Sequence, residues 1–209
     1  MLTIIIGDKN LSSWSLRPWL VLKHFGFEFR EIKLQLDTPE FKAQIAQYSG
    51  AARVPVLIDG ETRIWDSLAI AEYLNDKAGG LCWPSDPATR AQARSVSAEM
   101  HSGFAALRST WPMHAVGKNP RVPLTSATAG DVARVAEIWS ECRQAHGSQG
   151  SWLFGAYSIA DAMYAPVVLR FNHYGAEVSP SAAQYMQQTL QDEHLRAWIA
   201  DAEREVAGS

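Results

Sequence analysis

Cysteine is scarce in this sequence of 209 residues, and its two copies, Cys82 and Cys142, lie far apart. They form neither a Cys-x-x-Cys motif nor the spacing of a metal site, so we expect two free, buried thiols. Free thiols suit a reducing compartment, and the sequence therefore predicts a cytoplasmic protein. The six histidines include no His-x-x-x-His pair, so no pattern predicts a metal ion.

Long apolar runs are also missing. No segment approaches the roughly 18 consecutive apolar residues that a membrane helix needs. The opening run Leu2–Ile6 is too short for the core of a signal peptide and no basic run precedes it, so it predicts a buried strand. The formal net charge of −3 argues against the concentrated basic face that nucleic acids need. We therefore expect neither a membrane nor a nucleic acid as a partner.

Hydrophobic residues are abundant, at 47% of the chain, and their spacing divides it into two parts. The first 78 residues alternate short β-rich runs with helical periods and predict the order β-α-β-α-β-β-α. Strands are expected at 2–6 and 27–34 and as a hairpin over 54–65, whose turn is Asp59-Gly60. Helices are expected at 14–25, after a cap at Asp37 or Thr38 with Pro39 in the first turn, and at 66–74.

The second part has only helical periods. A linker at 79–87, rich in glycine and proline, separates a first domain at 1–78 from a second at 88–209. Helices are expected at 88–107, 131–146, 158–171, 179–190 and 194–206. Because Pro112, Pro120 and Pro123 follow the first of these, we expect that helix to end between 111 and 128.

Three local patterns carry possible chemistry, and each has a structural alternative. Ser12, Ser13 and Ser15 lie where the first helix begins, so a serine there either caps the helix or donates a hydrogen bond to a bound thiolate. Val54-Pro55 opens a strand, either in trans or as a cis peptide that turns the backbone of Val54 toward a peptide-like ligand.

The third pattern is Asp66-Ser67, at the start of the helix expected over 66–74. The pair either caps this helix or holds the carboxylate and the ammonium of a ligand. Taken alone, none of the three patterns decides between its two readings.

Taken together and in this order, the three patterns resemble the cytosolic glutathione S-transferase family. The run Ser158-Ile159-Ala160-Asp161 resembles the N-capping box of that family, and Pro166 and Arg170 follow at familiar distances. The resemblance covers essentially the whole chain. It implies an α/β thioredoxin-like N-terminal domain joined to an all-α C-terminal helical bundle, with glutathione as cosubstrate, a small-molecule electrophile as second substrate, and a homodimer.

Within the family, the run Ser12–Arg17 is most similar to the zeta class, whose signature is Ser-Ser-Cys-Ser-Trp-Arg. The alignment needs no gap and places the catalytic serine of that class on Ser12, with Ser13 as its supporting neighbour. Trp14 stands where the class has cysteine. Since Pro18 would fit more easily in a helix capped near Ser15, Ser13 and Ser15 remain candidates for the thiolate contact.

The resemblance also implies where the substrates bind. The γ-glutamyl end of glutathione would bind at Asp66 and Ser67, and its cysteinyl backbone would pair with Val54, before Pro55. Arg53 stands where relatives often carry glutamine and is a further candidate contact. The pocket for an apolar electrophile is expected at Trp14, Trp111 and Met113, although such residues are also common in protein cores.

Two other functions stay open. One is the cis-trans isomerisation of a substrate such as maleylacetoacetate, which zeta-class proteins carry out with glutathione. The other is a binding protein that keeps the fold without turnover. A thiol reductase is disfavoured, because no cysteine occupies the start of the first helix.

Overall fold

The first domain is built on a four-stranded sheet in the order β2-β1-β3-β4. The computed structural model describes residues 1–119 and 121–208, so the expectation for Pro120 lies outside the described residues. β1 pairs in parallel with β2 and antiparallel with β3, and β3 and β4 form the expected hairpin. The strands are β1 (Leu2–Ile6), β2 (Phe29–Lys33), β3 (Val56–Asp59) and β4 (Thr62–Trp65).

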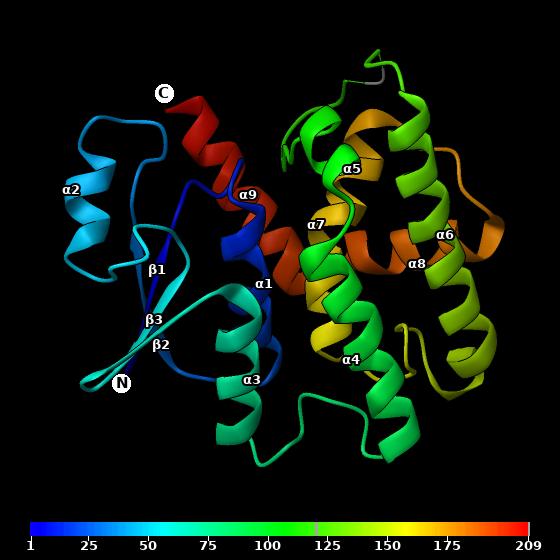
Figure 1. Cartoon of the computed structure of the whole chain (residues 1–209), viewed down its shortest axis with the longest axis horizontal. Helices are drawn as coiled ribbons and strands as arrows, with labels where there is room; N and C mark the ends of the chain where they lie inside the picture. Colours follow the sequence, from blue (N-terminus) through cyan, green and yellow to red (C-terminus); the bar gives the residue numbers. More distant parts are fainter. Residues whose placement is uncertain (120, 209) are drawn as a thin grey trace.

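Helices cover both faces of this sheet because β1 is apolar on both sides. Ile4 and Ile6 pack into the large core on the side of α1 (Ser13–His24) and α3 (Ser67–Lys77). Ile5 points the other way and packs with Ile45 of α2 (Phe41–Ala46). Figure 1 shows α2 on the outer side of the sheet, whereas α1 and α3 lie between the sheet and the second domain. The expected thioredoxin-like arrangement is confirmed.

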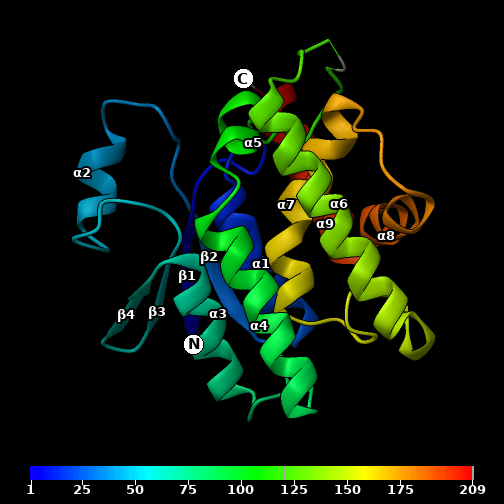
Figure 2. The same ribbon diagram turned by 45° about the vertical axis from the view of Figure 1, so that its right-hand side comes forward.

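The second domain is helical throughout its regular part. Its helices are α4 (Pro87–Ser102), α5 (Ala105–Thr110), α6 (Ser126–His146), α7 (Ile159–Tyr174), α8 (Pro180–Gln191) and α9 (Glu193–Ala207), with a 3-10 turn at Gly147–Gln149. α7 is buried along nearly its whole length. It lies between α1 and α6 in both ribbon views (Figures 1 and 2), so it joins the core of the second domain to the first.

α7 begins with the expected capping box. The Ser158 side chain accepts a hydrogen bond from Ala160 N, and Asp161 accepts from Ser158 N at 2.9 Å. Asp161 also accepts from Leu153 N at 3.0 Å, which fixes the loop before the helix. Both side chains are buried, so these bonds satisfy donors that water cannot reach.

Several expected helix boundaries were wrong. α2 was expected to be capped by Asp37 or Thr38, but it begins at Phe41. Its N-cap, Glu40, makes no capping hydrogen bond through its side chain. Asp37 has φ +57°, so residues 37–38 form a turn before the helix. The first helix of the second domain ends at Ser102, well before the prolines. The chain leaves the helix at Gly103, which is extended; a Cβ there would lie 2.7 Å from the Glu99 carbonyl oxygen, so this helix end requires glycine. α6 begins at Ser126, five residues earlier than expected, behind a Thr125 cap.

Pro18 lies inside α1, which begins at Ser13 with Ser12 as its N-cap. The helix is therefore not capped near Ser15, the position that Pro18 favoured in the sequence. Among the described residues, no helix is both long enough and apolar enough to cross a membrane.

The capping box predicts a purely structural role for Ser158. Ser158→Ala removes the side-chain acceptor at the start of α7 and should lower the free energy of unfolding by about 0.5–2 kcal/mol. Thermal unfolding followed by circular dichroism measures this loss. The exposed serine of the preceding segment, Ser151, provides the control variant Ser151→Ala, which should unfold as the parent does. Equal stability of the two variants would contradict the role of the cap.

Candidate functional site

Two neighbouring cavities lie where the first domain meets the second. The first has a volume of about 590 Å³ and is lined by Trp14, Ala51, Arg53, Val54, Pro55, Trp65, Asp66, Ser67 and His101. The second has a volume of about 360 Å³ and is lined by Leu11, Ser12, Ser13, Trp14, Leu36, Phe41, Arg53, Val54, Arg108, Pro112, Met113 and Arg170. Trp14, Arg53 and Val54 line both, so a ligand that fills one cavity can reach the other.

The first cavity ends at the start of α3. Asp66 has φ +75° and its Oδ1 accepts from Leu68 N and Ala69 N, which caps the helix. Its Oδ2 lies 3.1 Å from His101 Nε2 of α4. The Ser67 hydroxyl is buried without a hydrogen-bond partner among the described residues. An unsatisfied buried hydroxyl beside a carboxylate and a helix N-terminus is suited to a zwitterionic ligand.

Val54 and Pro55 form the wall between the two ends of the first cavity. The peptide bond that joins them is cis, which confirms the cis alternative and not the trans one. Arg53 is exposed and lines both cavities.

The three serines at the start of α1 are not equivalent. The Ser12 hydroxyl donates to Ser15 Oγ at 2.7 Å, and Gly7 N donates to the same oxygen at 3.1 Å. Ser15 is fully buried and lines neither cavity, so this chain of bonds points into the protein. The Ser13 oxygen accepts from an Arg170 guanidinium nitrogen at 3.3 Å, and Ser13 lines the second cavity.

Three arginines gather around Trp14 and the second cavity. The guanidinium carbon of Arg17 lies 4.3 Å from the centre of the Trp14 ring, and that of Arg108 lies 5.2 Å from it. Arg17 is buried, and its two terminal nitrogens have no hydrogen-bond partner among the described residues. Arg170 is also buried and donates to the Trp111 carbonyl at 2.9 Å.

These arginines are paired with neutral acceptors. Arg108 donates to the backbone carbonyls of His101 and Gly103, and Arg17 Nε donates to the Met163 carbonyl. Burial, together with repulsion from neighbouring arginines, lowers the pKa of Arg17 to about 9 and that of Arg170 to about 10. In the part of the chain that the structure describes, no acidic residue lines the second cavity, so an anionic group of a ligand would be stabilised there.

Of the three residues expected at the electrophile pocket, Trp14 and Met113 line the second cavity. Trp111 lies in the core of the second domain, where it stacks on Tyr174 with 5.1 Å between ring centres. The lining of the second cavity combines apolar side chains with three arginines, Arg53, Arg108 and Arg170. Arg108 and His101 were not among the predicted site residues, because no local motif marks either of them.

Neither cysteine belongs to the site. Cys82 and Cys142 are free and buried, and burial raises the pKa of each thiol to about 12. A thiol with so high a pKa is unreactive near neutral pH. Among the described residues, no group of three or more histidine, cysteine or acidic side chains could hold a metal ion.

Comparison with known proteins shows which proteins this chain resembles. Residues 11–77 match the family model described as "Glutathione S-transferase, N-terminal domain". The chain is 27% identical to a probable maleylacetoacetate isomerase of Caenorhabditis elegans, over 92% of this chain and 88% of the relative. A shorter match, 37% identical, covers 26% of this chain and 19% of dichloromethane dehalogenase from Methylorubrum extorquens.

Solved structures show the same fold. A glutathione transferase homologue from Burkholderia gl BGR1, with bound glutathione, superposes with a TM-score of 0.72 at 23% identity, over 97% of this chain and 98% of that chain. The nitrogen regulation fragment of the yeast prion protein Ure2p gives a TM-score of 0.73 at 21% identity, over 95% and 96%. The chain therefore has the fold of these glutathione S-transferase structures, and residues 11–77 resemble the N-terminal domain of that family.

Proposed function

We propose that this protein is a glutathione S-transferase that activates the glutathione thiol with a serine of α1. The single observation that carries the proposal is the pair of cavities that meet at Trp14, Arg53 and Val54, with Ser13 at the wall of the second. Family relatives and glutathione-bound structural neighbours support glutathione as the cosubstrate.

Glutathione fills the first cavity in this proposal. Its ammonium pairs with Asp66, and its γ-glutamyl carboxylate binds Ser67 and the N-terminus of α3. The backbone of Val54 pairs with the cysteinyl residue, and Arg53 is near enough to contact the tripeptide at the junction of the cavities. The sulfur then lies at the junction, beside the start of α1.

Ser13 rather than Ser12 supplies the hydrogen bond to the thiolate. Ser12 already donates inward to Ser15, whereas Ser13 accepts from Arg170 and keeps its own proton for the sulfur. Lowering the thiol pKa from about 8.5 by two units requires about 2.7 kcal/mol. A charge-assisted hydrogen bond of about 1.5–3 kcal/mol, together with about 0.3–1 kcal/mol from the helix N-terminus, is sufficient.

The reaction then proceeds in the second cavity. The thiol loses its proton to solvent on binding, and the sulfur lone pair forms a bond to the electrophilic carbon. In a substitution, the leaving group departs with its bonding electron pair; in an addition, the electron pair displaced from the double bond takes a proton from water. Ser13 and the N-terminus of α1 stabilise the thiolate before attack.

The electrophile carries an anionic group next to its reactive carbon. Arg108 and Arg170 line the cavity and form no ion pair with a carboxylate among the described residues, so a carboxylate of the ligand satisfies two desolvated cations. This also suits the second candidate function, isomerisation of an acid such as maleylacetoacetate, which the similarity to the C. elegans protein favours. The homodimer implied by the family resemblance stays a prediction.

The glutathione assignment predicts a loss of affinity in Asp66→Asn and Ser67→Ala. Each change removes a charged hydrogen bond worth about 1.5–3 kcal/mol, so the dissociation constant measured by calorimetry should rise about tenfold or more. In Asp66→Asn the side-chain oxygen can still accept the hydrogen bonds that cap α3, so a loss of glutathione affinity would not result from a loss of stability. The control Asp59→Asn acts at an aspartate that binds Tyr73 and Lys77, away from both cavities, and should leave the affinity intact. An unchanged dissociation constant in Asp66→Asn and Ser67→Ala would contradict the assignment of this site to glutathione.

The serine assignment predicts a change in the pKa of the bound thiol. Ser13→Ala should raise it by about one to two units, because each unit corresponds to about 1.4 kcal/mol. The pH dependence of thiolate absorbance in the glutathione complex measures this, with Ser12→Ala as the comparison. A raised pKa in Ser12→Ala alone transfers the role to Ser12. Unchanged values in both variants mean that no serine activates the thiol.

The arginine-lined cavity predicts selectivity for anionic electrophiles. Arg108→Gln should lower kcat/KM about tenfold for an electrophile with a carboxylate, since a charged hydrogen bond is worth about 1.5–3 kcal/mol. For its neutral methyl ester, kcat/KM should change little. Arg196→Gln, which removes the same charge from the exposed face of α9, is the matched control. An equal loss for acid and ester in Arg108→Gln would show that Arg108 does not recognise the anion.

A further inference from the structure

The segment from Gly7 to Ser12, which joins β1 to α1, is held by the second domain from two sides. On one side, Lys9 N donates to Glu205 at 2.8 Å and the Lys9 carbonyl accepts from Trp198 Nε1 at 2.7 Å. Both partners belong to α9, more than 180 residues away along the chain. α9 therefore fixes both backbone groups of a residue three positions before Ser12.

On the other side, the same segment binds the loop that follows α5. The Asn10 carbonyl accepts from Ala115 N at 3.0 Å, and its side-chain oxygen accepts from Val116 N at 3.0 Å. This loop also contributes Met113 to the wall of the second cavity. Adjacent residues of one short segment are thus attached to two separate parts of the second domain.

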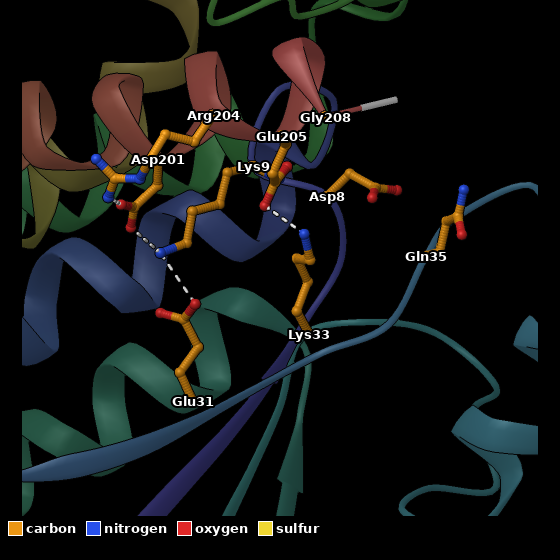
Figure 3. Close-up of a pocket in the computed structure, with 9 residues that line it drawn as sticks. All are labelled: Asp8, Lys9, Glu31, Lys33, Gln35, Asp201, Arg204, Glu205 and Gly208. Atoms are coloured by element: carbon orange, nitrogen blue, oxygen red, sulfur yellow. Dashed lines mark hydrogen bonds and ion pairs between the residues drawn. The ribbon is translucent and has the colours of Figure 1, made fainter.

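The Lys9 side chain makes the attachment to α9 specific. It is only 4% exposed, and its ammonium lies 2.6 Å from Asp201 of α9 and 2.9 Å from Glu31 of β2. Figure 3 shows the ammonium between these two carboxylates, at the edge of a cavity of about 660 Å³. The ammonium also lies 5.1 Å from the ring centres of both Trp19 and Trp198. A buried charge satisfied on every side tolerates little displacement.

We propose that Lys9, with Trp198, Asp201 and Glu205 of α9, is a positioning group that holds the thiolate-binding serine in place. We call these four residues the α9 clamp. The inference rests on the proposed function, because it assigns the clamp to the serine that activates glutathione. Hydrogen bonds weaken steeply with distance and angle, so a small shift of segment 7–12 lowers thiol activation without changing the ends of the glutathione site.

The clamp is tested with Lys9→Met, which keeps an apolar stem between the two tryptophan rings and removes the ammonium. The pKa of the bound thiol should rise by about one unit and kcat should fall about tenfold. The glutathione dissociation constant should change less than about threefold, because Asp66 and Ser67 are untouched. Trp198→Phe, which removes the donor to the Lys9 carbonyl and keeps an aromatic ring, should act in the same direction and replaces Lys9→Met should that variant fail to fold.

The matched control is Lys77→Met. It removes the ion pair of 2.6 Å between Lys77 of α3 and Asp59 of β3, which involves neither α9 nor segment 7–12. Its thiol pKa and kcat should match those of the parent. Changes of equal size in the control and the Lys9 variant would mean that the clamp serves stability alone, which overturns the inference.

Amide hydrogen exchange separates this inference from the proposed function. Exchange of residues 8–13 should become faster in Lys9→Met and Trp198→Phe, and not in Lys77→Met, whether or not glutathione is present. Unchanged exchange in the clamp variants overturns the inference even where glutathione turnover is normal. Failure of the parent protein to lower the thiol pKa, with the exchange result as expected, contradicts the proposed function and leaves the clamp as a structural finding only.

Discussion

The packing of α1 against α7 joins the two domains, and the position of the whole site depends on it. Arg17 of α1 donates to the Met163 carbonyl of α7 at 3.2 Å, and Arg170 of α7 reaches back to Ser13 at 3.3 Å. The residues that would bind glutathione come from the first domain, whereas Arg108 and Arg170 of the second cavity come from the second domain. Only when the two domains are packed together do the hydroxyl that would donate to the thiolate and the arginines that would bind an anion lie close enough to contact the same bound substrates.

Charge is distributed unevenly across this contact. The chain carries a formal net charge of −3, yet Arg17, Arg108 and Arg170 meet near Trp14 with neutral hydrogen-bond partners. Desolvation of these cations costs free energy in the ligand-free protein. The same cations would stabilise a thiolate on one side and an anionic electrophile on the other, so one feature would serve both substrates of the proposed reaction.

The sequence was informative wherever the cause of a structure is local. The caps at Asp66 and Ser158 were predictable because a cap and the N–H groups it binds lie within three residues of each other. The break at Gly103 was missed because it depends on the close approach of the Glu99 carbonyl, and proline signals further on were stronger. The proposed roles of His101, Arg108 and Lys9 depend on contacts with residues far away in the sequence. Neither hydrophobic periodicity nor a local motif predicts such contacts. The domain boundaries at 78 and 88 and the roles of the site residues stay predictions.

The central claim is that the glutathione sulfur lies at the junction of the two cavities, against the start of α1. A crystal structure of the complex with glutathione tests this most directly. The account predicts the sulfur within about 3.5 Å of the Ser13 hydroxyl, with the γ-glutamyl group at Asp66 and Ser67 and the arginine-lined cavity open beside the sulfur. Glutathione bound elsewhere, or in the first cavity with its sulfur turned away from both Ser12 and Ser13, would contradict it.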